Sequence, residues 1–426
     1  MNWKLLMSGL LLSGGLLISG CSMLPSPGSM ITAPRPAGAQ TQDNVPLKTV
    51  VQESLPPGAK LETPNNPDGA KAIQQQDIDG DGEDELLATY LVGQNPGELG
   101  AILLKKKQNN WEKVWELNEA LGYALDHAGF VDITGDGRPE LLLGWAMDPT
   151  NANGVEHNGL DIFTWQGNES GAGGGVAFDA GGNEIRSAQW QGTLTLMEEA
   201  SIGYQKMDVL NPPNQEDTGK QAALALWYHL DSRGEEVYNS DSGTEEHYYP
   251  DCTVFRWEKF GSDTGWAPAE DLYPEYFKNV VAFYQENVKE MPEDPHYWSS
   301  LANAQVGANL PEDALKSISK GEAIKSDDLK NSHWLVVKGE ALNKLGRYEE
   351  ARSTLTNAIE VLEGENGYGN GMAYFNLGQS YAGLKETDKA KAAYEKALEI
   401  IKQFEKRHNY SGYSQQPMVQ RALEKL

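Results

Sequence analysis

The chain has 426 residues, enough for two or three domains. Its formal net charge of −27 comes mainly from residues 1–272, which carry 16 basic and 40 acidic residues, against 19 and 22 in residues 273–426. Such a negative field repels phosphate backbones, so the composition argues against nucleic-acid binding. Cys21 and Cys252 are the only cysteines, so no disulfide framework is indicated.

The amino terminus has the pattern of a secretory signal peptide. Lys4 precedes an apolar run over residues 5–18, which is too short to span a membrane as a helix. The sequence Ile18-Ser-Gly-Cys21 resembles the lipobox of bacterial lipoproteins. That resemblance implies that residues 1–21 contain the lipoprotein signal and that Cys21 becomes lipidated. We therefore expect a lipid anchor on the extracytoplasmic face of a cell membrane, periplasmic or at the cell surface. The alternative is an ordinary signal peptide with an incidental cysteine.

Residues 22–58 are predicted to form a disordered tether. They are rich in Pro, Ser, Gly, Ala and Gln, and show little apolar periodicity. A flexible segment of this length reaches on the order of 35 Å, which holds the folded part clear of a bilayer.

Two acidic turns each lead directly into an apolar strand. Carboxylates on alternate residues of a tight turn can converge on one point, and Ca²⁺ prefers about six to eight oxygen ligands. The first turn offers Asp77, Asp79, Asp81, the carbonyl of Glu83, and Glu85. The second offers Asp132, Thr134, Asp136, the carbonyl of Arg138, and Glu140. We therefore predict calcium at both turns, the alternative being solvated acidic hairpin turns.

The spacing of these turns differs from an EF-hand because it closes at the ninth position and precedes a strand. It resembles the FG-GAP/VCBS repeats of integrin-type β-propellers, whose core is an Asp-rich calcium turn that leads into an apolar strand. The stretch Glu140-Leu-Leu-Leu-Gly-Trp-Ala146 matches that core. The resemblance implies a propeller-like all-β domain. Because no nucleophile or base adjoins Asp77–Glu85 in sequence, we expect calcium at the first turn to be structural and not catalytic.

Residues 59–272 as a whole read as short strands separated by Gly, Asn and Asp turns. Three weakly similar units are recognisable, and in the third Asn211-Pro-Pro-Asn replaces the acidic turn. Three units are fewer than a closed propeller needs. We therefore expect three blade-like antiparallel sheets packed side by side, as a partial propeller or an open sandwich.

Residues 273–426 change to a helical period, with an apolar stripe between Tyr276 and Val288 followed by three helix pairs. Small and large apolar residues recur in each pair, most clearly at Tyr374, Leu377, Gly378, Tyr381, Ala390, Tyr394 and Ala397. This spacing resembles tetratricopeptide repeats. Residues 417–426 are expected to form a capping helix. The predicted fold class is therefore multidomain α+β, an all-β domain followed by an all-α solenoid.

The tetratricopeptide resemblance implies a protein or peptide ligand in the concave groove formed by the first helix of each pair. Positions two, five and nine of the last repeat place Met372, Phe375 and Gln379 in that groove, flanked by Asn376. We expect substitutions at these positions to weaken partner binding and to spare folding.

The combined prediction is a membrane-anchored lipoprotein that acts as a calcium-stabilised scaffold for protein interactions. The sequence has no nucleophile elbow, HExxH motif, Walker A loop or paired cysteine ligands, so we do not predict an enzyme. The alternative is an envelope enzyme, or its accessory subunit, acting on cell-wall polymer or glycan. Clustered carboxylates in a deep cleft of the β-domain, away from the calcium turns, would favour that alternative.

Overall fold

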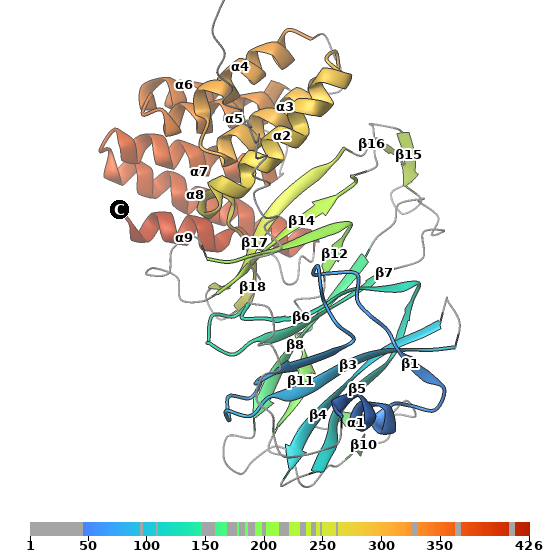
Figure 1. The fold of residues 1–426 in the computed structure, drawn as a ribbon. Helices are drawn as coiled ribbons and strands as arrows, with labels where there is room; N and C mark the ends of the chain where they lie inside the picture. The colour runs from blue at the N-terminus through green and yellow to red at the C-terminus, as the bar shows by residue number, and fades with distance from the viewer. Residues whose placement is uncertain are drawn as a thin grey trace, which may run out of the picture.

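The computed structural model describes residues 46–426 except 94–96, 108–109, 147–157, 168–176, 179–183, 186–191, 198–201, 213–220, 231–235, 240–243, 248, 261–262, 325–330, 363–367 and 409–413. Within these residues, open antiparallel sheets form the amino-terminal part and helices form the carboxy-terminal part (Figure 1). The last strand ends at Pro268, and the first α-helix after it begins at Pro274.

Three antiparallel sheets, here called A, B and C, make up most of the β region. Sheet A consists of β1 (Ala59–Leu61), β2 (Ile73–Gln76), β3 (Glu85–Val92), β4 (Gly97–Lys107) and β5 (Asn110–Gly122). Sheet B consists of β6 (Ala124–Val131), β7 (Glu140–Ala146), β8 (Asn158–Gly167), β11 (Gly192–Leu196) and β12 (Ile202–Tyr204). Sheet C consists of β13 (Lys206–Leu210), β14 (Ala223–Tyr228), β17 (Asp251–Phe260) and β18 (Asp263–Pro268). Two short hairpins are formed by β9 (Ala177–Phe178) with β10 (Glu184–Ile185), and by β15 (Glu236–Asn239) with β16 (Thr244–His247).

The three sheets stack face to face, because the inner strands are apolar on both faces. In β3, Leu86 packs against the outer helix α1 (Leu47–Ser54), and the next residue, Leu87, points into the core between sheets A and B. In β7, Leu141 packs in the core between sheets A and B, and the next residue, Leu142, packs in the core between sheets B and C. This alternation follows from the two-residue period of a strand. The layer order is therefore α1, sheet A, sheet B and sheet C.

Helix α1 differs from the sequence prediction, which placed residues 22–58 in a disordered tether. Residues 22–45 lie outside the described residues, but α1 is ordered and its Val51 is fully buried. Leu47, Val50 and Val51 form an apolar helix face that covers the outer side of sheet A. The prediction of disorder followed the Pro-rich composition around this short helix and overlooked the helical spacing of its apolar residues.

The helical region begins with a short 3₁₀ helix, η3 (Glu270–Leu272), and then contains α2 (Pro274–Glu290), α3 (Pro295–Gly307), α4 (Pro311–Glu322), α5 (Asn331–Lys344), α6 (Tyr348–Leu362), α7 (Tyr368–Gly383), α8 (Thr387–His408) and α9 (Gln416–Glu424). Helices α3–α4, α5–α6 and α7–α8 form antiparallel pairs. Small residues let the paired helices approach closely: a Cβ atom on Gly378 would lie 2.5 Å from the ring of Tyr394. Among the described residues, no helix is both long enough and apolar enough to cross a membrane.

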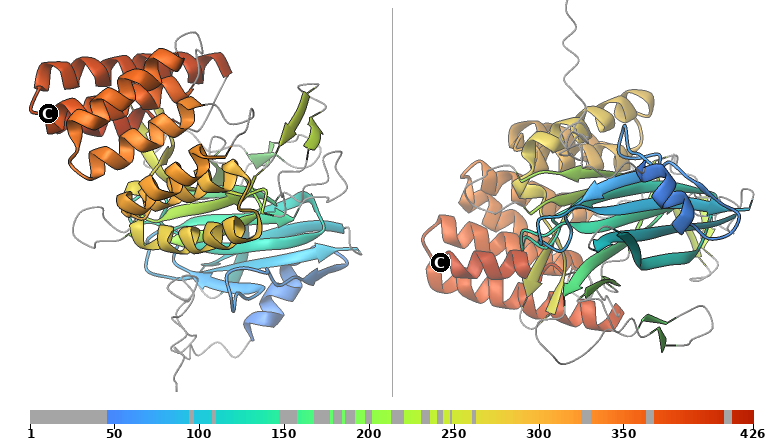
Figure 2. Two further views of the ribbon diagram at one scale, coloured as in Figure 1. Left: turned by 90° about the horizontal axis from the view of Figure 1, so that it is seen from above. Right: turned by 60° about the horizontal axis from the view of Figure 1, so that its bottom comes forward.

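The helical region is attached to sheet C at two places. At its start, Tyr276 of α2 accepts a hydrogen bond from Trp227 Nε1 of β14 at 2.8 Å, within a shared apolar core. At its end, Arg421 of α9 forms an ion pair with Glu258 of β17. Figures 1 and 2 show the helices at the sheet C end of the stack, with α1 at the opposite end. The solenoid therefore begins and ends on the same sheet.

Candidate functional sites

The two acidic turns have the same backbone geometry. The first joins β2 to β3, and the second joins β6 to β7. Asp77 accepts hydrogen bonds from the N–H groups of Gly80 and Gly82 at 2.8 and 3.0 Å. Asp132 accepts the same two bonds, from the glycines three and five residues later, at 2.6 and 3.0 Å. These glycines have φ angles of 78° and 90° in the first turn and 80° and 89° in the second, values that favour glycine.

The glutamate that closes each turn is buried. Glu85 Oε2 accepts the N–H of Ile78 at 3.0 Å, and Glu140 Oε2 accepts the N–H of Ile133 at 2.7 Å. Each glutamate is 1% exposed. Burial raises the pKa of both carboxyl groups to about 7, and the backbone hydrogen bonds oppose that shift. A cation bound at either turn would therefore stabilise the ionised form of the glutamate that closes the turn.

A lysine occupies the centre of the first turn. Lys105 Nζ, from β4, lies 2.7 Å from Asp81 Oδ2 and 3.0 Å from Glu85 Oε1, and also contacts Asp79. Burial alone would lower the pKa of Lys105, but its bonds to the three carboxylates raise it above the ordinary value. Lys105 was not predicted from sequence. Strand pairing puts it there, because Leu104 of β4 lies opposite Leu86 of β3.

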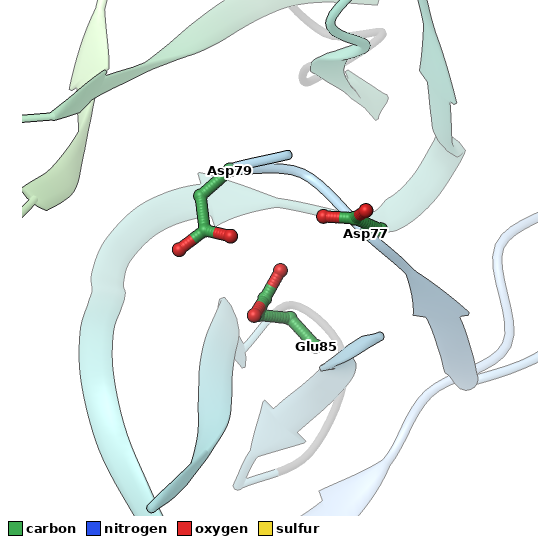
Figure 3. A group of neighbouring side chains, drawn as sticks. All are labelled: Asp77, Asp79 and Glu85. Carbon is green, nitrogen blue, oxygen red and sulfur yellow. The ribbon is translucent and has the colours of Figure 1, made fainter. Parts of the chain in front are cut away.

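The first turn fits a hard cation. One ligand atom each from Asp77, Asp79 and Glu85 lies within 4.8 Å of the others, and Figure 3 shows these carboxyl groups around a common space. The carboxylate oxygens that surround the Lys105 ammonium group are also arranged to bind a metal ion. A metal ion at this position would have to displace Lys105 Nζ. The predicted carbonyl ligand Glu83 donates its N–H to Asp81 Oδ1 at 2.9 Å.

The second turn is less suited to a cation. Among the described residues, its side chains do not form a comparable group of converging ligand atoms. Thr134 donates its hydroxyl to Glu140 Oε1 at 3.2 Å, and Arg138 donates its N–H to Asp136 Oδ1 at 2.8 Å. The corresponding connection in the third unit, residues 213–220, lies outside the described residues, as does the predicted lipidation site Cys21.

The concave face of the helices borders a cavity of about 960 Å³ against sheet C, here called the interdomain cavity. Three of the predicted groove residues, Met372, Phe375 and Gln379 of α7, line it. Asn376 does not belong to the lining and is 1% exposed. Phe375 is 6% exposed and its ring packs on Tyr394. The expectation that substitutions spare folding therefore suits Met372 and Gln379, but not Phe375 and Asn376.

Sequence reasoning missed four carboxylates in the lining of the interdomain cavity. They are Asp251 at the start of β17, Glu270 and Asp271 in η3, and Glu340 in α5. Glu340 occupies position nine of the middle repeat, the position that Gln379 holds in the last, so the same counting rule would have found it. The other three come from the β region and its junction with the helices, and no sequence pattern pointed to them.

Three of these carboxyl groups, those of Asp251, Glu270 and Glu340, have raised pKa values. Burial raises the pKa of Glu270 to about 8, and the nearby charges of Asp271, Asp251 and Glu340 add to the shift. Burial also raises the pKa of Asp251 and of Glu340. By solvent-accessible surface, Asp251 and Asp271 are exposed, and Glu270 and Glu340 are partly buried. Lys344 is the basic residue of the lining, and it favours the charged form of Glu340.

Residues 332–403 match the family model for the tetratricopeptide repeat. This range runs from α5 into α8 and contains the predicted groove residues. Among solved structures, a crystal structure of MamA has 21% identity and a TM-score of 0.25, with 35% of this chain and 85% of that chain covered. A second, MamA MSR-1 C2, has 19% identity and a TM-score of 0.25, with 32% and 74% covered. No curated protein matches the chain. The functional argument therefore rests on the tetratricopeptide match and on the geometry of the sites.

Proposed function

We propose that the protein is a lipid-anchored, extracytoplasmic scaffold whose tetratricopeptide region binds a protein or peptide partner. The observation that carries this proposal is the interdomain cavity, which is lined by the first helices of the repeats, including Met372 and Gln379 of α7. Tetratricopeptide repeats are solenoids that use extended concave surfaces for binding. A cavity of this size accommodates several side chains of a partner segment.

We further propose that sheets A, B and C are FG-GAP/VCBS-like units that hold the helices in place. The repeated geometry of the Asp77 and Asp132 turns supports this assignment. In the first turn, Asp77, Asp79, Asp81 and Glu85 would supply carboxylate oxygens to a calcium ion, which would neutralise their mutual repulsion and stabilise the fold. The β region then serves as a platform to which both ends of the helical region are fixed.

The partner-binding proposal is tested by truncating two side chains that line the cavity. In the variant Met372→Ala/Gln379→Ala, partner recovery in a pull-down from native envelopes is expected to fall about tenfold, because loss of central contacts typically costs over 1 kcal/mol. The matched control is Val361→Ala/Gln403→Ala on exposed faces of α6 and α8. Equal recovery by wild type and by the cavity variant would show that partners bind elsewhere.

The membrane proposal is tested at the predicted lipidation site. In the variant Cys21→Ser, the protein is expected to move from the membrane fraction to the soluble fraction, because a serine cannot carry the thioether-linked lipid. Fractionation followed by immunoblotting measures this shift, with Cys252→Ser as the control that removes the other cysteine, which is buried. A Cys21→Ser protein that stays with membranes would place the anchor elsewhere.

An enzyme that acts on glycan is a second candidate, because clustered carboxylates border the interdomain cavity. A pair of carboxyl groups with separated pKa values is what general acid and base catalysis of glycoside hydrolysis requires. The tetratricopeptide match favours binding over hydrolysis. Release of reducing ends from wall polymer by the wild type, and its loss in Glu270→Gln, would reverse this preference.

A further inference from the structure

The carboxylates of the interdomain cavity come together from separate parts of the fold. We define the acidic wall as Asp251, Glu270, Asp271 and Glu340. Sheet C contributes the first, η3 the next two and α5 the last, so the wall exists only where the helices are docked on the sheet. The four charges act on one another, since Glu270 interacts electrostatically with each of the other three.

The chain does not neutralise the acidic wall as it neutralises the first acidic turn. In that turn, Lys105 supplies an ammonium group to three carboxylates. Among the ion pairs of the described residues, none includes Asp251, Glu270 or Glu340. Lys344 is near Glu340 and offsets one negative charge of the four. Partly buried carboxylates such as Glu270 and Glu340 destabilise a fold when their charge is not fully compensated, and a ligand of opposite charge then binds favourably.

The rest of the lining is suited to an apolar group. Val336 of α5 and Met372 and Phe375 of α7 border the same cavity as the acidic wall. A flexible methionine adapts its shape to different apolar side chains. Anionic or purely apolar ligands would leave the acidic wall without a counter-charge, whereas a cation beside an apolar group would satisfy both parts of the lining.

We infer that the interdomain cavity selects a partner segment in which an arginine or lysine side chain enters the acidic wall and a neighbouring apolar side chain packs on Met372 and Phe375. This inference rests on the proposed function and names the chemistry of the partner. A guanidinium group offers five N–H donors in a fixed fork, so it can bond to more than one carboxylate at once.

The test uses the full mature chain and two capped hexapeptides as probes, Ala-Leu-Arg-Leu-Arg-Ala and the same peptide with citrulline in place of arginine. Citrulline keeps the shape of arginine and removes its charge. Titration calorimetry in buffer of physiological ionic strength at pH 9, where Glu270 is ionised, is expected to show at least tenfold tighter binding of the arginine peptide. Glu270→Gln and Glu340→Gln, tested separately, are expected to weaken arginine-peptide binding about tenfold and to leave citrulline-peptide binding unchanged.

The control for the general negative charge of the protein is Glu360→Gln, an exposed position on α6 that changes the net charge equally. It is expected to bind both peptides like the wild type. Equal affinity of the two peptides, or absence of binding by both, would overturn the inference. The pull-down distinguishes this outcome from failure of the proposed function. If the peptides show no preference for a cation but Met372→Ala/Gln379→Ala loses its envelope partners, the cavity binds partners without selecting a cation, and the proposed function stands. Equal loss of arginine-peptide affinity in Glu360→Gln would show attraction to the whole surface and would also overturn the inference.

Discussion

Replacing Glu270 with glutamine is expected to stabilise the protein above pH 8 and to change its stability little near pH 4. Burial and the neighbouring negative charges raise the pKa of Glu270 from 4.5 to about 8 in the folded state. Between these two values the folded state holds a proton that the unfolded state releases. Stability therefore falls as the pH rises from 4.5, and the full penalty is present above pH 8. Glutamine keeps the shape of the side chain and removes that penalty.

The size of this effect follows from the shift in pKa. One pKa unit corresponds to about 1.4 kcal/mol, so the shift sets an upper limit on the order of 5 kcal/mol. Solvent in the cavity reduces it, and we expect a gain of about 1–3 kcal/mol at pH 9. The charges of Asp251, Asp271 and Glu340 act on Glu270, and Lys344 acts on Glu340, so the pH profile belongs to the cluster and not to one residue.

Urea denaturation of wild type and Glu270→Gln at pH 5, 7 and 9 measures this gain, with partner and added cations absent. The matched variant Glu360→Gln makes the same change of charge at an exposed position, and its stability is expected to follow that of the wild type. Parallel stability profiles for wild type and Glu270→Gln would show that Glu270 ionises at its ordinary pKa. The acidic wall would then carry no uncompensated charge.

The backbone conformation of the acidic turns was predictable because their geometry is local. Asp77 is joined to Gly80 and Gly82 by hydrogen bonds that span five residues or fewer, so residue order alone fixes which atoms meet. Lys105 was not predicted, because it reaches the turn through the pairing of β3 with β4. Counting back from the hairpin would have identified it, since the residue after the partner of Leu86 is a lysine.

The helical repeats were also predictable, and for a similar reason. Each repeat buries its small residues within its own helix pair, so Ala314, Ala351 and Ala390, all fully buried, recur at nearly even spacing. The cavity was only half predictable. Its α7 side follows from repeat positions, but its Asp251 and Glu270 side depends on how the helices dock on sheet C. Docking is decided by complementary surfaces far apart in sequence, and no single-sequence pattern encodes it.

Calcium is expected to raise the melting temperature of the wild type and to have little effect on Asp77→Ala/Asp81→Ala. Binding to the folded state alone stabilises it by RT ln(1 + [L]/Kd). Extracellular calcium modules commonly have Kd values on the order of 10⁻⁴–10⁻³ M, so a few-fold excess gives about 1 kcal/mol. The double variant removes two of the carboxylates around the first turn, including one that bonds to Lys105, so we expect it to lose about 2–4 kcal/mol of stability without calcium.

Lys105→Met separates the role of the lysine from that of the ion. The Lys105 side chain is 15% exposed, and its loss leaves Asp79, Asp81 and Glu85 to repel one another. This variant is expected to melt below the wild type in chelator and to gain more than the wild type from calcium, because the ion no longer displaces an ammonium group. Lys113→Met, in the same sheet at a more exposed ion pair, is the control and is expected to respond to calcium like the wild type. Wild type and Lys105→Met must both be shown to be metal-free at the start. If calcium then shifts the melting curve of neither protein, the first turn does not bind calcium, and Lys105 is the only cation at that turn.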